Sequence, residues 1–339
     1  MAKGLVLVTG ASGYIAGEVI RQLLADGWAV RGTVRNPAKA DRMLAAMGQT
    51  RETLPLFAAD LDSDAGWAEA AAGVDYVQHI ASPIPANVPK NPDDLIRPAR
   101  DGALRVLAAA KAAGVRRVVM TSSTAAVCYG MDGTRRVFTE ADWTNPDHPD
   151  TYPYVRSKTI AERAARDWMA ANGAGMEFVT INPGLVLGPV QNADHSASVE
   201  VMVKLLSGAL PGTPNFGFPV TDLRDIADAH VRAMTTPGLA GERFLCAGQF
   251  LWMREIAAIL RAELGPKARK VPTRGLPDVL LKLIALFDPA VRIVLTELGK
   301  ERICDAGHAR ERLGWVPRPA AETIRDCGNS LIGKGVVKI

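Results

Sequence analysis

Short apolar runs alternate with amphipathic segments along the first half of the chain. The apolar runs have the length and the bulky side chains of buried strands, and they fall at residues 5–8, 29–34, 54–59, 75–81, 117–122 and 178–182. The segments between them have helical spacing and fall at residues 17–26, 37–47, 64–71, 93–113 and 154–172. Because strands that alternate with helices usually pair in parallel, this pattern predicts an α/β fold with a doubly wound parallel sheet.

The alternation weakens after Pro183. Proline and glycine become frequent over residues 183–219, a helix is expected at 198–208, and residues 222–230 resemble a loop that leads into a helix. The apolar stretch 279–295 is interrupted by Lys282, Asp288, Pro289 and Arg292, so we expect helices that cover a pocket and not a membrane span. The second half is therefore predicted to form a smaller C-terminal lobe.

Composition narrows the class of protein. Of the 339 residues, 48% are hydrophobic and 22% are charged, which is ordinary for a globular protein. The net charge of +4 comes from scattered basic residues, so we expect no nucleic-acid partner. The four cysteines form no Cys-x-x-Cys pair and have no metal-ligand spacing with the histidines, which predicts reduced thiols, no metal site and a cytoplasmic location.

A glycine-rich turn follows the first predicted strand. Gly10 allows a sharp turn, Gly13 lets the backbone approach a pyrophosphate, and Ala16 is small enough for the following helix to lie close to the sheet. The free N–H groups at the helix N-terminus favour an anion. We predict a dinucleotide site here that also includes the turn residues Thr9, Ser12, Tyr14 and Ile15. A tight strand-to-helix turn without a ligand is the alternative.

The end of the second strand indicates which dinucleotide is bound. NAD-binding folds place an acid there, whereas this strand ends at Arg35, with Lys39 and Arg42 further along. Arg35 and Lys39 are therefore predicted to bind the 2′-phosphate of NADP; three solvated surface cations are the alternative. After the third strand, Asp60 could accept a hydrogen bond from the adenine amino group while Leu61 packs on the ring. A helix N-cap at Asp60 is the alternative.

Tyr154 and Lys158 are the candidate catalytic residues. Positions four apart share a helix face, so both side chains can point at one site. A phenol is a poor acid near neutral pH, and we expect the ammonium of Lys158 to lower the pKa of Tyr154. Tyr154 could then give a proton to a forming alkoxide, and Lys158 could hold the hydroxyls of the nicotinamide ribose.

A hydroxyl group at the end of the fifth strand could complete this set. Carboxyl ends of parallel strands line the ligand crevice, and a hydroxyl there can polarise a substrate carbonyl. Three consecutive candidates occur: Ser122, Ser123 and Thr124. We favour Ser123, then Ser122, then Thr124, while capping and turn formation are the alternative roles.

Together these motifs resemble those of the extended short-chain dehydrogenases/reductases, and within them the dihydroflavonol reductase and microbial aldehyde/ketone reductase branch. The resemblance covers roughly residues 4–250 and rests on these sequences: Thr9-Gly10-x-x-Gly13-x-x-Ala16, Thr121-Ser122-Ser123, Tyr154-Val155-Arg156-Ser157-Lys158, His79-Ile80-Ala81-Ser82-Pro83, Ser157-Lys158-Thr159-Ile160-Ala161-Glu162 and Asn182-Pro183-Gly184-Leu185-Val186-Leu187-Gly188-Pro189. Two departures occur. Ala16 replaces the usual glycine, and Tyr152-Pro153 stands where cinnamoyl-CoA reductases carry a tryptophan-tyrosine motif, which weakens a CoA-thioester assignment.

The resemblance implies a Rossmann-type NADP(H)-binding domain and a Ser-Tyr-Lys set carried by Ser123, Tyr154 and Lys158. It also implies cofactor contacts from two further stretches, namely Ala81, Ser82 and Pro83, and Pro183, Gly184 and Val186. We accordingly divide the chain into an NADP-binding domain at 1–188, to which 220–250 returns, and a mainly substrate-binding lobe at 189–339.

The leading hypothesis is an NADPH-dependent reductase of an aldehyde or ketone, working as a monomer or homodimer without a membrane partner. Residues 83–92, 190–198, 216–219 and 279–287 are expected to line a pocket for an apolar, possibly aromatic substrate. A nucleotide-sugar epimerase or dehydratase on the same scaffold is one alternative, although such enzymes more often use NAD. A non-catalytic NADP sensor is the other, although a sensor has no need for both Tyr154 and Lys158.

Overall fold

A parallel sheet forms the centre of the protein. The computed structural model describes residues 2–83, 89, 91–191 and 196–339. The sheet strands are β1 (Leu5–Val8), β2 (Ala29–Val34), β3 (Leu56–Ala58), β4 (Tyr76–His79), β5 (Arg117–Thr121), β7 (Glu177–Pro183) and β10 (Arg243–Cys246). They lie in the order β10-β7-β5-β4-β1-β2-β3, and all neighbours are parallel. Because the strand order reverses at β1, the carboxyl ends of β1 and β4 border a crevice.

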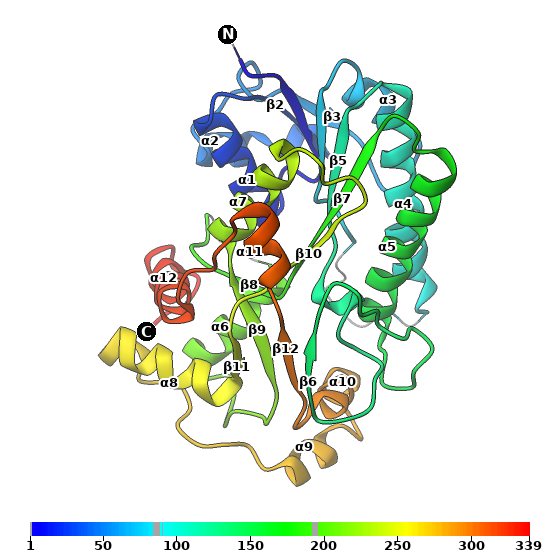
Figure 1. Ribbon diagram of the computed structural model, residues 1–339. Helices are drawn as coiled ribbons and strands as arrows, with labels where there is room; N and C mark the ends of the chain where they lie inside the picture. Colours follow the sequence, from blue (N-terminus) through cyan, green and yellow to red (C-terminus); the bar gives the residue numbers. More distant parts are fainter. Residues whose placement is uncertain (1, 84–88, 90, 192–195) are drawn as a thin grey trace.

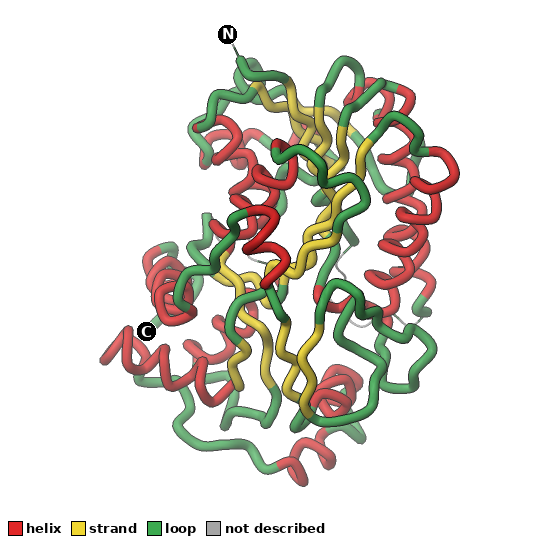
Figure 2. Tube along the Cα trace, viewed as in Figure 1, coloured by secondary structure: helices red, strands yellow, loops and turns green. Residues whose placement is uncertain are grey.

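Helices cover both faces of this sheet (Figures 1 and 2). The core on one face is formed with α1 (Tyr14–Ala25), α2 (Asp41–Ala46), α7 (Leu223–Thr235) and α11 (Gly307–Leu313). The core on the other face is formed with α3 (Trp67–Ala71), α4 (Asp93–Ala112) and α5 (Pro153–Asn172). The predicted doubly wound α/β fold is thus confirmed.

A smaller lobe lies below the carboxyl ends of the strands in Figure 1. Its three-stranded sheet joins β8 (Leu185–Leu187), β9 (Gly217–Asp222) and β11 (Phe250–Trp252). Around this sheet pack α6 (Ala197–Ser207), α8 (Met253–Leu264) and α12 (Ala320–Gly333). A two-stranded parallel sheet pairs β6 (Arg135–Phe138) with β12 (Glu301–Cys304), and the short helices α9 (Asp278–Ile284) and α10 (Pro289–Glu297) lie at the far end.

The chain crosses between the two parts several times. After β9 it enters α7 and β10, which return to the central sheet, and α11 later packs on the same side of that sheet. Conversely, β6 belongs to the first half of the chain but pairs with β12 from the C-terminal part. The assignment of cofactor binding to 1–188 and 220–250, and of substrate binding to the rest, stays a prediction.

Several predicted elements are shorter in the structure, including the strands at 54–59 and 75–81 and the helices at 37–47 and 64–71. The strand at 75–81 ends at His79 because the N–H groups of Ile80 and Ala81 donate to Thr9 Oγ1, both at 3.0 Å. The helix at 64–71 begins at Trp67, after Gly66 with φ +84°. The helix at 37–47 is divided at Ala40 into a 3₁₀ turn, Pro37–Lys39, whose start is capped by the Asn36 side chain, and α2.

The predicted apolar segment at 279–287 presents large apolar side chains to solvent. Val279 is 69% exposed and Phe287 is 88% exposed. The helix formed there, α9, has seven residues. Across the described ranges, no helix has both the length and the apolar character needed to cross a lipid bilayer.

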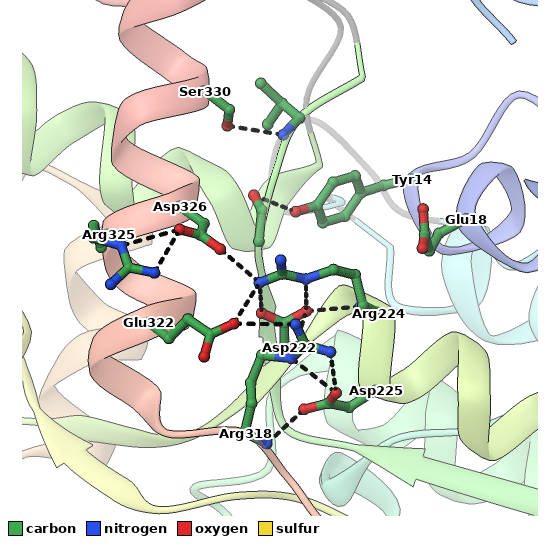
Figure 3. Close-up of polar contacts among 12 residues, drawn as sticks. Tyr14, Glu18, Asp222, Arg224, Asp225, Arg318, Glu322, Arg325, Asp326 and Ser330 are labelled. Atoms are coloured by element: carbon green, nitrogen blue, oxygen red, sulfur yellow. Dashed lines mark hydrogen bonds and ion pairs between the residues drawn. The ribbon is translucent and has the colours of Figure 1, made fainter. Parts of the chain in front are cut away.

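The C-terminal helix α12 is joined to the central part by a network of arginines and carboxylates (Figure 3). The Arg224 guanidinium donates to both oxygens of Asp222 and to Asp326 on α12, each at 2.9 Å. Arg318, just before α12, binds Asp225 on α7 with Nε–Oδ1 at 2.9 Å. Bidentate pairs of this kind fix orientation as well as distance, so α12 has one defined position on α7 and β9.

The glycine-rich turn also contacts the lobe. The Tyr14 hydroxyl donates to the carbonyl oxygen of Gly188 at 2.8 Å, and two residues later the N–H of Val190 donates to Ser330 Oγ on α12 at 2.9 Å (Figure 3). The turn, the end of β8 and α12 are therefore connected through consecutive hydrogen bonds.

Trp315 anchors the segment after α11 to the central part. Its side chain is fully buried and its indole N–H donates to the Asp225 carbonyl oxygen at 2.8 Å. We expect Trp315→Ala to lower the free energy of unfolding by about 3–5 kcal/mol, because it leaves a large cavity. Urea unfolding would measure this. The matched control is Val316→Ala, since Val316 is 65% exposed; equal losses in both variants would contradict the anchoring role.

Candidate active site

A cavity of about 570 Å³ lies at the carboxyl ends of the central strands. Its walls come from the glycine-rich turn, the ends of β2, β3, β4, β5 and β7, and the first turns of α4 and α5. This is where a parallel α/β sheet binds its ligand. The cavity therefore lies at the position that the sequence motifs predicted.

The glycine-rich turn forms one end of the cavity. Gly10 has φ +66°, and a Cβ there would lie 3.1 Å from the Ala81 Cα. Gly13 precedes α1, donates its N–H to the Gly10 carbonyl oxygen at 2.8 Å and lines the cavity. Gly13 has φ −76°, which any residue can adopt, so backbone strain does not require a glycine here. An added Cβ would lie 3.1 Å from Gly10 O, and the absence of a side chain leaves space in the cavity.

Small residues in the next helical turn serve packing. Ala16 is fully buried in the core on the α1 side of the sheet. A Cβ on Gly17 would lie 2.5 Å from Gln191 Oε1. The alanine at position 16 is therefore compatible with close packing of α1, and a side chain at position 17 would displace the end of the flexible Gln191 side chain.

Most of the predicted site residues line the cavity. These are Gly10, Ser12, Gly13, Tyr14, Ile15, Arg35, Asp60, Leu61, Ala81, Ser82, Pro83, Ser123, Tyr154, Lys158, Pro183, Gly184 and Val186. Thr9 does not line the cavity. Its buried hydroxyl is hydrogen-bonded to His79 Nδ1 at 3.0 Å and accepts the N–H groups of Ile80 and Ala81 in the loop after β4. The side chains of Lys39 and Arg42 fall outside the described part of the structure.

The two residues predicted to hold the adenosine, Arg35 and Asp60, both line the cavity. Arg35 is exposed and lines the cavity at the end of β2. Asp60 also lines it, but one carboxylate oxygen accepts from the Asp62 N–H at 3.1 Å. Asp60 thus forms a local turn, but it is not the helix N-cap that was the alternative interpretation, because the following helix α3 begins at Trp67 with Gly66 at its N-cap.

Sequence reasoning missed a further group of wall residues: Thr33, Val34, Ala59, Asp62, Trp67, Ile80, Asp94, Leu95, Pro98 and Thr121. Several of them end a strand next to a predicted residue, so their position was a usable signal. Asp94, Leu95 and Pro98 lie on α4, and nothing in their spacing indicates a ligand.

The predicted pocket segments are only partly seen in this wall. Segments 216–219 and 279–287 contribute no residue to the wall of the described cavity. The segments 83–92 and 190–198 contain residues 84–88, 90 and 192–195, which lie outside the described residues. The substrate side of the cavity is therefore described through Pro83, Ser196 and Ser198.

Ser123, Tyr154 and Lys158 line the same cavity as the glycine-rich turn. Tyr154 and Lys158 lie in the first turns of α5, and Ser123 follows β5. The side chains of Tyr154 and Ser123 are hydrogen-bonded. Lys158 Nζ donates to Ser82 Oγ at 3.0 Å, after β4. Three segments far apart in the sequence thus converge on one polar site.

The three neighbouring hydroxyl groups have different surroundings. Ser122 Oγ donates to the buried Glu162 carboxylate at 2.5 Å. Ser123 Oγ accepts the Ala125 N–H at 3.1 Å, as a turn residue, and also bonds Tyr154. Thr124 begins a 3₁₀ turn, Thr124–Ala126. Ser123 therefore combines the capping role with a contact to the proposed acid.

Burial sets the electrostatics of this site. It lowers the pKa of Lys158 to about 8, against an opposing effect of Glu162. It raises the pKa of Tyr154, while the hydrogen bond with Ser123 acts in the other direction. The expectation that Lys158 lowers the pKa of Tyr154 is thus wrong for this structure, because loss of solvation outweighs every other effect on the phenol.

A glycine cradle at the point where the strand order reverses defines a Rossmann-type dinucleotide-binding protein. The chain belongs to the NAD dependent epimerase/dehydratase family, whose sequence model matches residues 6–247.

Individual relatives are reductases. Cinnamoyl-CoA reductase 1 of Petunia hybrida is 38% identical over 262 residues, which are 76% of each protein. Dihydroflavonol 4-reductase of Zea mays is 34% identical over 273 residues, covering 76% of this chain and 74% of the relative. Yeast methylglyoxal/isovaleraldehyde reductase Gre2, in a crystal structure with NADPH, superposes with a TM-score of 0.82 at 25% identity over 98% of this chain and all of that chain. The predicted family, its dihydroflavonol reductase-like branch and the oxidoreductase class are confirmed.

Proposed function

We propose that this protein is an NADPH-dependent reductase of an aldehyde or ketone, which also runs in reverse as an alcohol dehydrogenase. The observation that carries the proposal is the convergence of Ser123, Tyr154 and Lys158 in the cavity that the glycine-rich turn borders. The cofactor is NADPH, the molecule present in the related Gre2 structure. The glycine cradle and the cation Arg35 at the end of β2 fit its pyrophosphate and 2′-phosphate.

Each residue of the set has a separate task in reduction. NADPH supplies the hydride when it is bound. The Ser123 hydroxyl donates a hydrogen bond to the substrate oxygen and polarises the carbonyl. Tyr154 gives its phenolic proton to the same oxygen as negative charge develops there. Lys158, with its pKa at about 8, is mostly an ammonium at neutral pH and holds ribose hydroxyls beside Tyr154.

The raised pKa of Tyr154 suits the reductive direction. A proton donor has to be protonated before the reaction, and burial keeps the phenol in that form. Alcohol oxidation needs the opposite, a phenolate that accepts a proton. We therefore propose reduction as the preferred direction near neutral pH.

The substrate is proposed to be apolar and free of a CoA group. Wall residues near the catalytic set include Leu95, Pro183 and Val186, which favour apolar surfaces. The cinnamoyl-CoA reductase relatives act on a thioester by name, but Tyr152 and Pro153 replace the motif that precedes the catalytic tyrosine in that group.

A panel of aldehydes, ketones and CoA thioesters, assayed by NADPH consumption, tests the function. We expect turnover of apolar aldehydes or ketones and little turnover of thioesters. Conversion of a nucleoside-diphosphate sugar without net NADPH consumption would favour the epimerase alternative instead. NADPH binding without turnover of any carbonyl would favour a sensor.

Arg35 is proposed to select NADPH over NADH. Because Arg35 stands where NAD-binding folds carry an acid, Arg35→Ala should raise the KM for NADPH about 10-fold or more and leave NADH kinetics nearly unchanged. Steady-state kinetics with both cofactors would measure this. The control is Arg31→Ala, because Arg31 is on the same strand but its guanidinium binds the Ala72 carbonyl oxygen at 2.9 Å. Equal losses with NADPH and NADH in Arg35→Ala would contradict the assignment.

A further inference from the structure

Glu162 lies on the same face of α5 as the proposed catalytic residues, one turn beyond Lys158 and two beyond Tyr154. Its side chain is completely buried. A buried carboxylate is costly unless it is paired and hydrogen-bonded, so its surroundings show what it contributes.

Five side chains surround this carboxylate. Two are cations, Arg243 with Nε at 2.7 Å and Arg166 with Nε at 3.3 Å. Three are neutral donors: Ser122 Oγ at 2.5 Å, Asn182 Nδ2 at 2.8 Å and Thr180 Oγ1 at 3.1 Å. Burial by itself would raise the pKa of Glu162, but the charges of Arg243 and Arg166 and the bond from Ser122 lower it, so the group is ionised at neutral pH.

The neutral donors connect Glu162 to the strand ends that form the catalytic site. Ser122 directly precedes Ser123, and Asn182 directly precedes Pro183 in the cavity wall. Asn182 Nδ2 also donates to the Ser123 carbonyl oxygen at 3.1 Å. One carboxylate thus fixes the end of β5 and the end of β7 relative to α5.

The charged groups facing Lys158 come from few elements. On β4, His79 is neutral, because burial and then Lys158 lower its pKa to about 3. After β4, Ser82 accepts the Lys158 hydrogen bond without a charge. On α5, Tyr154 is a neutral phenol and Glu162 is an anion that acts to raise the pKa of Lys158. Among these groups Glu162 is the anion, and its own charge is partly balanced by its ion pairs with Arg243 and Arg166.

We infer that Glu162 is a positioning residue for the Ser123–Tyr154–Lys158 set: it fastens the strand ends behind Ser123 and supplies the negative charge that keeps Lys158 an ammonium. The catalytic meaning of this inference rests on the proposed function. The effect on Lys158 itself does not, because it is a property of the folded protein.

Removing the charge should alter Lys158 in a predictable direction. An opposite charge nearby stabilises a charged group, and its loss changes a pKa by about 1–3 units. We expect Glu162→Gln to move the midpoint of Lys158 deprotonation from about 8 downward by about 1 pH unit. The alkaline decline of kcat for carbonyl reduction should move to lower pH by the same amount.

Competitive labelling with trace acetic anhydride measures the midpoint directly. The rate at which Lys158 is acetylated, read by mass spectrometry of its peptide, rises as the amine loses its proton. Lys204, an exposed lysine on α6, corrects for changes in reagent reactivity with pH. This measurement needs no substrate, so it remains valid if the protein proves not to reduce carbonyls.

Two further variants separate charge from packing. Arg243→Met breaks the same buried ion pair but keeps the carboxylate, so it should destabilise the fold without lowering the Lys158 midpoint. The double variant Glu162→Gln/Arg243→Met removes the carboxylate charge together with its nearer cation, and Arg166 keeps its hydrogen bonds to the Gly241 carbonyl oxygen and Thr180 Oγ1. It should show the lowered midpoint, and it decides the question if Glu162→Gln alone does not fold.

Three outcomes would overturn the inference. One is an unchanged midpoint in folded Glu162→Gln or in the double variant, and another is an equal decrease in Arg243→Met. The third is a lowered midpoint of Lys158 deprotonation together with an unchanged alkaline decline of kcat. That result would show that the charge of Lys158 does not contribute to catalysis. Absence of carbonyl reduction in the wild-type protein, with the midpoint behaving as expected, would instead refute the proposed function alone.

Discussion

Replacing Tyr154 by phenylalanine is expected to reduce kcat for carbonyl reduction by about 10²–10⁴-fold, the usual contribution of a general acid. The substitution removes one oxygen, and the Tyr154 hydroxyl is bonded to Ser123, not to a backbone group. The fold and the affinity for NADPH should therefore persist. Steady-state kinetics would measure kcat, and a fluorescence titration of NADPH on the same preparation would measure cofactor affinity.

Tyr152→Phe is a matched control for this change. Tyr152 lies two residues earlier, and its ring meets Tyr129 edge-on with 6.1 Å between centroids. Removing its hydroxyl should leave kcat within about 10-fold of wild type, because Tyr152 does not line the described cavity. Lys158→Met should differ from both variants, by losing activity and weakening NADPH binding together. Substantial carbonyl reduction by Tyr154→Phe would refute the mechanism and indicate another acid.

The parts of the site that sequence predicted are local in the chain. Gly10 and Gly13 form one turn, and Tyr154 and Lys158 form one helix face, so their spacing determines their geometry. Each of these segments also lies close in sequence to the apolar strand or the helix that positions it. A single window of residues contains the whole signal in each case.

The support behind the site could not be predicted in the same way. Glu162 was visible as part of a family motif, but its partners Thr180, Asn182 and Arg243 come from β7 and β10, which sequence does not place beside α5. The return of Trp315 to the central core depends on a contact with Asp225, which lies 90 residues earlier in the chain. Long-range pairs of this kind are decided by tertiary packing, not by local pattern.

Burial explains the error about Tyr154. A sequence shows that a lysine is four residues away, but it does not show how much solvent the phenol loses. The structure shows both, and the loss of solvation has the larger effect on the pKa. The raised pKa keeps Tyr154 protonated before the reaction but also makes it a weaker acid, so its role as proton donor depends on the negative charge that develops on the substrate oxygen.

The largest effect on cofactor binding is expected from Gly13→Val. Gly13 lies at the start of α1 in the cavity wall, where the cofactor pyrophosphate would approach the helix N-terminus. A valine side chain would fill that space and hold the phosphates away from the free N–H groups. NADPH binding, followed by the change in its fluorescence, should fall by at least about 100-fold, and activity should fall with it.

The fold should tolerate this substitution better than the equivalent change at Gly10. Gly13 has φ −76°, which any residue adopts, and the nearest atom to an added Cβ is Gly10 O at 3.1 Å. At Gly10, by contrast, φ is +66° and the Ala81 backbone is 3.1 Å away, so Gly10→Val should lose both binding and thermal stability. We thus expect Gly13→Val to unfold within a few degrees of wild type while failing to bind NADPH. If Gly13→Val bound NADPH within a few-fold of wild type, the dinucleotide would have to bind away from this turn. The role assigned to Arg35 in the same cavity would then also be wrong.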